Sequence, residues 1–422
     1  MQRRAFIKAL AAGAAVGAFS PMAHAALPKG RVLVVGGGYA GATAAKYLKM
    51  WGGEQLEVIL IERNTTFVSC PLSNLVLGGS KHIGDLTFNY SGLDRHVVKR
   101  LHAEVTGIDP AQRKVFFEDG DFLDYDRLVI APGIDFMYDA LPMLESSSAQ
   151  EAIPHAWKAG PQTVNLRRQL EAMPDGGVFA IGIPKAPYRC PPGPYERACM
   201  VAAYLKQHKP KSKVLVLDAN PEIQSKKALF EKAYAQHYAG ILEYRANSEL
   251  KEVQGKVAKL EFEDVKADVL NVVPPQRAGD IAKSTGLINV NQRWSAVNWL
   301  TMESTAVAGV HVLGDATFPG PGMPKSGHMA NQHAKVAAAA IIQLLKGEAV
   351  NSTPVVMNTC YSFVTARDVI HVASVHQYDA ADKVFKPVPG SGGVSAAANQ
   401  IEGRYALSWA QNIWDDMLAG TA

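Results

Sequence analysis

The chain has 422 residues and a mass of 45.4 kDa, with 48% hydrophobic and 19% charged residues. Its length predicts two or three packed domains, and its apolar content excludes a disordered chain. Four cysteines are too few for a disulfide-rich scaffold, and a formal charge of +4 does not indicate nucleic-acid binding.

The first 25 residues have the pattern of an export signal. Arg3 and Arg4 precede a mild apolar stretch rich in alanine and glycine, which ends at the small-x-small cleavage site Ala23-His24-Ala25. We expect residues 1–25 to be a twin-arginine signal peptide and the mature protein to reside in the periplasm. An uncleaved anchor helix is the alternative. Beyond this segment no apolar run reaches about 18 residues, so no transmembrane span is expected in the mature chain.

The next segment has the order strand, glycine-rich turn, helix, strand and acidic residue. A strand is expected over residues 31–35, a helix over 42–50 and a second strand over 56–61, which ends at Glu62. The turn reads Gly36-Gly37-Gly38-Tyr39-Ala40-Gly41. Such glycines let the backbone approach a pyrophosphate, and an acid about 20 residues further on binds a ribose hydroxyl. The unit predicts an adenine dinucleotide site without distinguishing FAD from NAD.

Two later segments favour FAD. Residues 128–133 (LVIAPG) resemble the strand and turn that close the first half of a flavin domain. Residues 310–315 (VHVLGD) resemble a strand ending in Gly-Asp, whose carboxylate holds the ribityl chain of the flavin. Together these segments resemble the two-dinucleotide-domain flavoproteins. The resemblance implies an α/β, glutathione-reductase-like fold with two Rossmann-type domains and a smaller C-terminal α+β domain.

In that family the FAD domain is split by an insertion, which gives the expected domain boundaries. Residues 26–140 and 285–349 are expected to form the FAD-binding domain, and residues 141–284 a second nucleotide-type domain. Residues 350–422 are expected to form a C-terminal domain of short strands that covers the flavin.

The second nucleotide-type domain is expected to keep its fold but not its ligand. A strand over residues 177–181 is followed by a turn without the glycine motif, in which Pro184 and Pro187 lack the backbone donors that a pyrophosphate needs. A further strand over residues 214–217 ends at Asp218, as a dinucleotide unit would. We therefore expect NAD(P) binding to be lost.

The cysteines are Cys70, Cys190, Cys199 and Cys360, and their spacing matches no zinc site and no c-type haem motif. No metal site is therefore expected. Cys190 precedes a predicted helix that starts near Pro194. The helix N-terminus and the adjacent Arg189 should both favour a thiolate. Cys199 lies at an apolar helix position and is expected to be buried and unpaired.

Glu196 falls in the first turn of the same predicted helix, close enough to Cys190 to act as a base. Compensation of the helix dipole alone is the alternative for Glu196. Cys70 follows the acidic end of the second strand, within residues 67–74 (FVSCPLSN), where a flavin fold passes beside the isoalloxazine ring. A buried structural thiol is the alternative for Cys70.

Three segments resemble the flavoprotein subunit of flavocytochrome c sulfide dehydrogenase: residues 67–74, residues 188–196 (YRCPPGPYE) and residues 323–327 (MPKSG). The resemblance implies FAD attached covalently through an 8α-S-cysteinyl bond at Cys70. It also implies a redox-active disulfide between Cys190 and Cys360 over the flavin, with an inert structural disulfide as the alternative.

The residues expected to serve the site share either the dinucleotide motifs or a match to this family. Cys190, Cys360 and Glu196 are the expected catalytic residues. The residues expected to contact the cofactor are Gly36, Gly38, Tyr39, Ala40, Gly41, Glu62, Arg63, Cys70, Val105, Gly133, Gly314, Asp315 and Lys325. Lys325 is expected to stabilise negative charge on the reduced flavin.

The resemblance implies a sulfide dehydrogenase that oxidises sulfide to zero-valent sulfur or polysulfide. Because the chain has no haem motif, a c-type cytochrome subunit is expected to accept the electrons in a heterodimer. A sulfide:quinone oxidoreductase is one alternative. A second is an auxiliary thiol-redox flavoprotein that reactivates a sulfur-carrier protein, and a third is a flavin-binding subunit without catalysis.

Overall fold

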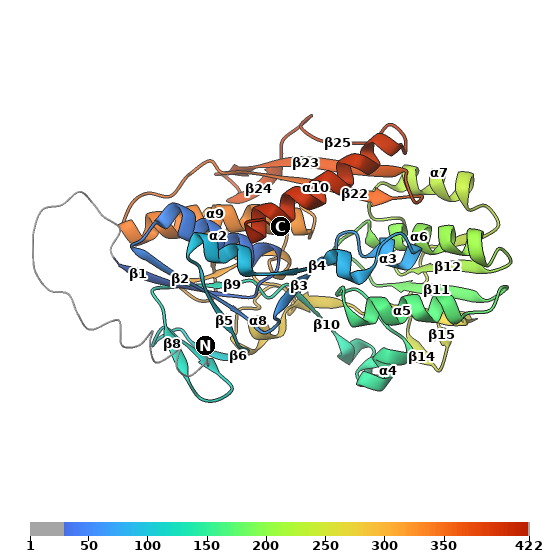
Figure 1. Ribbon diagram of the computed structural model, residues 1–422, viewed down its shortest axis with the longest axis horizontal. Coiled ribbons are helices and arrows are strands. Elements are labelled where there is room, and N and C mark those ends of the chain that lie inside the picture. Colours follow the sequence, from blue (N-terminus) through green and yellow to red (C-terminus); the bar gives the residue numbers. More distant parts are fainter. Residues whose placement is uncertain (1–28, 421–422) are drawn as a thin grey trace, which may run out of the picture.

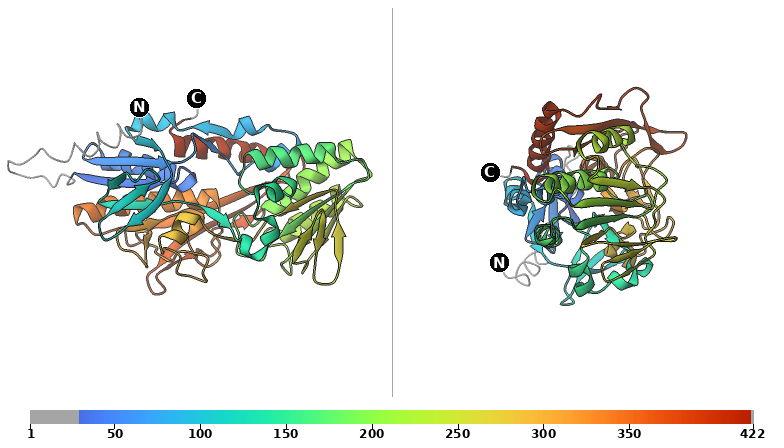
Figure 2. Two further views of the ribbon diagram at one scale, coloured as in Figure 1. Left: turned by 90° about the horizontal axis from the view of Figure 1, so that it is seen from below. Right: turned by 90° about the vertical axis from the view of Figure 1, so that its right-hand side faces the viewer.

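The computed structural model describes residues 29–420, so the expected signal peptide lies outside the described residues. The chain forms three parts, the first of which is built from two segments that lie before and after the second part in the sequence (Figure 1). The first nucleotide-binding part lies on one side, the second lies on the other, and the C-terminal part spans both (Figures 1 and 2). In the described part of the chain, no helix is long and apolar enough to cross a membrane.

The first part is built on a seven-stranded sheet whose central strands are parallel and buried. Its order is β19 (Val297–Asn298), β20 (Glu303–Ser304), β21 (Val310–Val312), β9 (Arg127–Ile130), β1 (Gly30–Val35), β2 (Leu56–Glu62) and β5 (Lys99–His102). Val32 pairs with Val58 on one side and with Arg127 on the other. Near-continuous apolar strands are typical of a parallel sheet that is covered on both faces.

Helices α2 (Tyr39–Gly52) and α9 (Gly327–Lys346) pack against each other on this sheet. The close approach of α2 to β1 depends on glycine, because a Cβ at Gly41 would lie 1.7 Å from the carbonyl oxygen of Gly36. Gly36 itself has a φ of 98°, which disfavours any residue with a side chain. The glycine-rich turn expected from the sequence therefore forms, and α2 begins and ends outside the expected 42–50.

Smaller elements complete this part and connect it to the next. They are β3 (Thr66–Val68), α3 (Asn74–Gly78), β4 (Thr87–Asn89), β6 (Val105–Asp109), β7 (Lys114–Phe117), β8 (Phe122–Asp124), β10 (Ile134–Phe136), β18 (Gln276–Ala278), α8 (Asp280–Ser284) and the short 3-10 turns η1 (Ile83–Leu86), η2 (Ser91–His96), η3 (Tyr138–Ala140), η4 (Pro142–Leu144) and η5 (Gly314–Ala316).

The second part has its own parallel sheet, in the order β13 (Leu242–Arg245), β12 (Lys213–Asp218), β11 (Val178–Ile183) and β17 (Val269–Val272). Its other elements are α4 (Ser147–Ala152), α5 (Pro161–Ala172), α6 (Gly193–His208), α7 (Lys227–His237) and the antiparallel strands β14 (Glu252–Gln254), β15 (Val257–Lys259) and β16 (Asp264–Lys266). The strand–helix–strand unit of a nucleotide domain is thus retained. A loop over residues 184–192 replaces the usual tight turn before α6.

The C-terminal part differs from the short strands expected there. β22 (Val355–Phe363) and β23 (Val369–Asp379) form a long antiparallel hairpin with nine residue pairs. Strands β24 (Val384–Pro387) and β25 (Gly393–Val394) add to β23, and α10 (Gln400–Leu418) packs across the hairpin and against α2. The glycines near residue 390 mark only the turn before β25, so they do not break the two long strands.

Candidate functional site

A cavity of about 1170 Å³ lies where the three parts of the chain meet. Its walls include the glycine-rich turn before α2, the segment around Cys70, the loop before α6, the start of α9 and the middle of β22. The cavity therefore draws on every domain expected from the sequence, and no single domain encloses it.

One end of the cavity has the features of a dinucleotide site. The amide of Gly37 donates a hydrogen bond to the Glu62 carboxylate at 2.6 Å, which fixes the acid at the end of β2. A Cβ placed on Gly38 would meet no atom within 4 Å, so the backbone there is open. Backbone donors beside a helix N-terminus and a nearby acid fit the pyrophosphate and ribose of FAD.

Asp315 provides a second observation that fits FAD. Its Oδ1 atom is buried and makes no hydrogen bond, although the residue lines the cavity. Burial raises the pKa of Asp315, and the positive charges of Arg189 and Lys325 oppose that rise. A buried acceptor without a partner is costly. The hydroxyl groups of a ribityl chain would satisfy it.

Most of the expected cofactor contacts line this cavity. They are Gly36, Gly38, Tyr39, Ala40, Glu62, Arg63, Cys70, Val105, Gly133, Gly314 and Asp315. Gly41 lies behind them, packed on Gly36.

Lys325 does not line the cavity, which differs from the expected contact with the flavin. Its ammonium donates to the backbone carbonyls of Asp315, at 2.9 Å, and of Thr317. It also lies 3.6 Å above the ring of Trp294, and burial lowers its pKa to about 7. Lys325 therefore holds the backbone of the Asp315 loop, and that backbone faces the cavity.

Cys70 lies between β3 and α3 with its sulfur on the cavity wall. The amide of Ala159 donates to Sγ at 3.4 Å, and the carbonyl of Trp157 lies 3.7 Å from Sγ. Cys70 and Asp315, ahead of the sequence neighbour Cys190, are the groups that most raise the pKa of Arg189. The cation expected to serve Cys190 therefore lies beside Cys70 and Asp315.

Cys190 and Cys360 line the same cavity although 170 residues separate them. All four cysteines are free thiols in the structure. The amide of Cys190 donates to the carbonyl of Lys325 at 2.9 Å, and its φ of 60° is unusual for a residue with a side chain. Cys360 lies in β22, where Asn358 Nδ2 donates to its Sγ at 3.2 Å.

The expected thiolate at Cys190 is not supported. Burial raises the pKa of Cys190 to about 12, and the neighbouring Cys360 and Glu196 raise it further than Arg189 lowers it. The guanidinium of Arg189 does lower the pKa of Cys190, as expected, but desolvation of the sulfur outweighs it. Cys199 is fully buried in α6, as its apolar neighbours predict.

Glu196 is buried in the first turn of α6, and its carboxylate connects three segments. Oε1 accepts the amide of Phe363 at 2.8 Å, and Oε2 accepts the side-chain amide of Asn74 at 2.8 Å. Burial raises the pKa of Glu196 despite these two donors. A surface carboxylate that only compensates the helix dipole would not have such partners. Asn74 ends the segment 67–74 but was not among the expected site residues; Arg197 Nε donates to its Oδ1 at 3.1 Å.

Asp218 occupies the position of the ribose-binding acid in the second domain, but its carboxylate oxygens already accept hydrogen bonds from other side chains and the backbone of this domain. They accept hydrogen bonds from the hydroxyls of Tyr195 at 2.7 Å and Tyr244 at 3.0 Å, and from the amide of Asn220 at 2.9 Å. These internal donors take the place of a ribose, which agrees with the proline-containing loop before α6.

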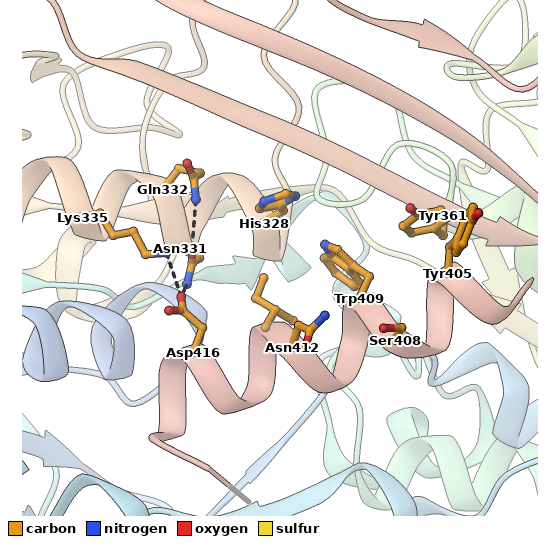
Figure 3. A pocket seen from close by; sticks show the side chains of 11 residues that line it. His328, Asn331, Gln332, Lys335, Tyr361, Tyr405, Ser408, Trp409, Asn412 and Asp416 are labelled. Atoms are coloured by element: carbon orange, nitrogen blue, oxygen red, sulfur yellow. Dashed lines mark hydrogen bonds and ion pairs between the residues drawn. The ribbon is translucent and has the colours of Figure 1, made fainter. Parts of the chain in front are cut away.

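A smaller pocket of about 390 Å³ lies beside the main cavity, between α9 and α10 (Figure 3). His328, Tyr361 and Trp409 line both spaces, so these side chains form a shared wall. At the far end of this pocket, Asp416 on α10 binds Asn331 and Lys335 on α9. Among residues 29–420 no group of three or more histidine, cysteine, aspartate or glutamate side chains is arranged to hold a metal ion.

Three family models match the chain. Residues 163–274 match the central part of the sulfide dehydrogenase [flavocytochrome c] flavoprotein chain, and residues 352–418 match the flavin-binding part of flavocytochrome c sulphide dehydrogenase. Residues 30–150 match the pyridine nucleotide-disulphide oxidoreductases.

Two curated relatives extend these matches. The flavoprotein chain of sulfide dehydrogenase [flavocytochrome c] from Chlorobaculum thiosulfatiphilum is 52% identical over 46 residues, which is 11% of this chain and 94% of that sequence. The mitochondrial sulfide:quinone oxidoreductase of Dictyostelium discoideum is 23% identical over 304 residues, 68% of this chain. The match spans 65% of that relative's length.

Solved structures share the fold. The sulfide:quinone oxidoreductase of Aquifex aeolicus has a TM-score of 0.74 and 20% identity, with 93% of this chain and 92% of that chain covered. Putidaredoxin reductase in its covalent complex with putidaredoxin has a TM-score of 0.64 and 16% identity, with 94% of this chain and 100% of that chain covered. The expected α/β fold with Rossmann-type domains is confirmed.

Proposed function

Since this chain belongs to the family of the flavocytochrome c sulfide dehydrogenase flavoprotein chain, we propose that it is the flavoprotein subunit of a periplasmic sulfide dehydrogenase. In this proposal it oxidises sulfide to zero-valent sulfur or polysulfide and passes the electrons to a c-type cytochrome subunit. The observation that carries the proposal is the convergence of Cys190, Cys360 and Glu196 on one cavity that also contains Cys70.

Different residues of the cavity would hold different parts of FAD. Gly36–Ala40 and Glu62 would hold the dinucleotide end of FAD, Asp315 the ribityl chain, and Cys70 the ring through a covalent bond. When bound, FAD accepts two electrons together and can release them singly. A covalent bond at Cys70 would keep the cofactor in place in a compartment that does not resupply it.

In the proposed reaction, Cys190 and Cys360 form the redox-active pair. Sulfide as HS⁻ opens their disulfide by thiol–disulfide exchange, which leaves a persulfide on one cysteine and a thiolate on the other. Glu196 accepts the remaining proton, because its buried carboxylate lies beside Cys190 and has a raised pKa. With FAD as the two-electron acceptor, the outer sulfur would leave as zero-valent sulfur and the disulfide between Cys190 and Cys360 would re-form.

Intact mass measurement after acid denaturation tests the cofactor part of the proposal. We expect the mass of FAD to remain on the wild-type chain, with the adduct located to the peptide that contains Cys70. The Cys70→Ser variant should release its FAD on denaturation. Free release of FAD from the wild-type protein would contradict the covalent bond without contradicting FAD binding.

Sulfide-dependent electron transfer tests the acceptor. We expect the protein with its cytochrome partner to reduce cytochrome c with sulfide faster than it reduces a soluble quinone. The similarity to sulfide:quinone oxidoreductases makes the opposite outcome the second candidate function. Reactivation of a thiol on a sulfur-carrier protein, without net sulfide oxidation, would instead support the auxiliary role. For the periplasmic location, replacing Arg3 and Arg4 by lysine should retain the protein in the cytoplasmic fraction.

A further inference from the structure

A buried lysine lies directly behind the cysteine pair. Lys226 is 8% exposed, and its ammonium donates to the carbonyl of Cys360 at 3.0 Å and to the hydroxyl of Ser362 at 2.8 Å. Both acceptors are neutral, and the acidic groups that favour the charged form of Lys226 are Cys360 first, then Glu196 and Cys190. The neighbouring Lys227, in contrast, forms a surface ion pair with Glu222 at 2.9 Å. A buried cation is costly unless an anion lies near it.

The backbone at Lys226 is held in an uncommon conformation. The residue precedes α7 with a φ of 56° and a ψ of 37°, in the left-handed region that residues with side chains rarely adopt. In this conformation the Lys226 side chain is buried against β22, whereas that of Lys227 is at the surface. The loop before α7 thus brings a charge from the second domain to a strand of the C-terminal domain (Figure 1).

The two cysteines of the pair have unequal surroundings. For Cys360, burial raises the thiol pKa, and the nearby Lys226 is the largest opposing influence, followed by hydrogen bonds from Asn358 and Ser326. For Cys190, burial raises the pKa, Cys360 and Glu196 raise it further, and Arg189 and Lys226 are the weaker opposing influences. A negative charge is therefore better accommodated on Cys360 than on Cys190.

We propose that Lys226 is a positioning residue that makes Cys360 the leaving sulfur, so that the sulfur taken from sulfide is carried by Cys190. This inference rests on the proposed function. HS⁻ attacks Sγ of Cys190, a new sulfur–sulfur bond forms there, and the bond from Cys190 to Cys360 breaks. The electron pair of the broken bond stays on Cys360 as a thiolate, and the proton stays on the outer sulfur of the Cys190 persulfide until Glu196 accepts it. The incoming sulfur is oxidised as the disulfide is reduced.

The direction follows from exchange chemistry and from the charges around Cys360. A disulfide opens faster when the departing sulfur forms the more stable thiolate. The titratable groups that act on Cys360 are Lys226 before α7, Glu196 on α6 and Cys190, and Glu402 on α10 acts in addition on Lys226. His328 on α9 accepts the amide of the adjacent Thr359 at 3.0 Å, and burial lowers its pKa. Burial lowers the pKa of Lys226 to about 8, so its charge is present below that pH and is lost above it.

Alkylation of the reduced holoprotein tests the unequal ionisation. The protein is treated with short pulses of iodoacetamide across a pH series, and mass spectrometry quantifies the peptides that contain Cys190 and Cys360. The pH of half-maximal rate reports ionisation rather than access. We expect Cys360 to ionise at the lower pH. Lys226→Met should reduce the thiolate fraction of Cys360 about tenfold, whereas Lys226→Arg should preserve most of it.

Lys209→Met is the matched control, because Lys209 is a buried lysine whose ammonium donates to the carbonyl of Glu171 at 2.7 Å, at the far end of α6. It should leave both ionisation curves unchanged. Earlier ionisation of Cys190 in the wild-type protein would overturn the proposal, even if Lys226→Met failed to fold. An unchanged Cys360 curve in a folded Lys226→Met protein would overturn the role of Lys226.

Location of the transferred sulfur tests the direction itself. The oxidised holoprotein is mixed with sodium sulfide, quenched with iodoacetamide and digested. We expect the added mass of one sulfur atom on the Cys190 peptide and simple alkylation on the Cys360 peptide. The reverse distribution would overturn the proposal and leave the proposed function intact. Added sulfur on neither peptide, with no sulfide-dependent flavin reduction, would contradict the proposed function instead.

Discussion

The carboxylate of Glu196 accepts the backbone amide of Phe363 at 2.8 Å, and this bond joins residues that are 167 positions apart. It connects the first turn of α6 to the end of the strand that carries Cys360. Glu196, the expected proton acceptor, is therefore held between the segment that follows Cys190 and the strand that carries Cys360.

Glu196→Gln should slow sulfide-dependent flavin reduction about a hundredfold, because the amide cannot accept a proton. The carboxylate is the active form of a base, so wild-type activity should rise with pH through the pKa of Glu196, which burial raises above the usual value. In the variant, the rise of the rate through the pKa of Glu196 should disappear. The remaining pH dependence should come only from the ionisation of sulfide. Stopped-flow rates across the pH series measure both effects. An unchanged rate and profile would contradict the role of Glu196.

The cysteines should divide into essential and dispensable ones. Cys190→Ser and Cys360→Ser should each abolish sulfide-dependent flavin reduction, because neither leaves a pair to form a disulfide. Cys199→Ala should retain the reaction and lower the free energy of unfolding by about 1 kcal/mol, the cost of a small cavity in a fully buried site. Flavin absorbance and denaturant titration measure the two properties. Full sulfide-dependent reduction in either serine variant would contradict the redox pair.

Asp315→Asn should have opposite effects on the protein with and without FAD. Without FAD, removing a buried carboxylate whose Oδ1 has no partner should raise the melting temperature. With FAD, the weaker acceptor should lower cofactor affinity about tenfold. The affinity is measured in the Cys70→Ser background, so that a covalent bond does not hide it. Asp218→Asn is the control, because that carboxylate has internal donors and its loss should only destabilise the fold.

Neither NADH nor NADPH should reduce the bound flavin. The acid expected to hold the nicotinamide cofactor's ribose, Asp218, is occupied by Tyr195, Tyr244 and Asn220. Anaerobic absorbance spectra with each nucleotide measure the result, and sulfide serves as the positive control. Rapid bleaching by either nucleotide would show that the second domain still binds it.

Asp416→Asn should destabilise the protein by about 1 kcal/mol at pH 7 and much less in acid. Burial opposes ionisation of Asp416, but hydrogen bonds from Tyr47, Asn331 and Lys335 outweigh it and lower the pKa. Stability from this carboxylate is therefore present above its ordinary pKa and lost as the pH falls through the lowered one. Urea titrations at pH 7 and in acid compare it with Glu222→Gln, which removes only a surface ion pair. An equal loss at both pH values would contradict this account.

Local motifs explain how much of the fold was predictable. The apolar run over residues 31–35, the glycine turn and Glu62 are neighbours in the sequence, and each restricts the backbone directly. They became β1, the start of α2 and the end of β2. Strands were expected in residues 350–422, but their length was wrong, because the glycines at residues 390–393 lie only in the turn before β25 and at its start and do not interrupt β22 or β23.

The site was less predictable, because its charges depend on distant segments. In the sequence Lys325 is a cation within a family motif, yet its side chain turns towards Trp294 and the backbone. Lys226 and Lys227 look alike, and only the backbone before α7 separates the buried one from the exposed one. The desolvation of Cys190 likewise depends on β22 and α6 together. The spacing of residues in the sequence does not show that these two elements meet.

Each sulfur on the cavity wall comes from a different part of the chain: Cys70 from the first, Cys190 from the second and Cys360 from the third. The three sulfurs therefore reach one cavity only when all three parts have folded against one another.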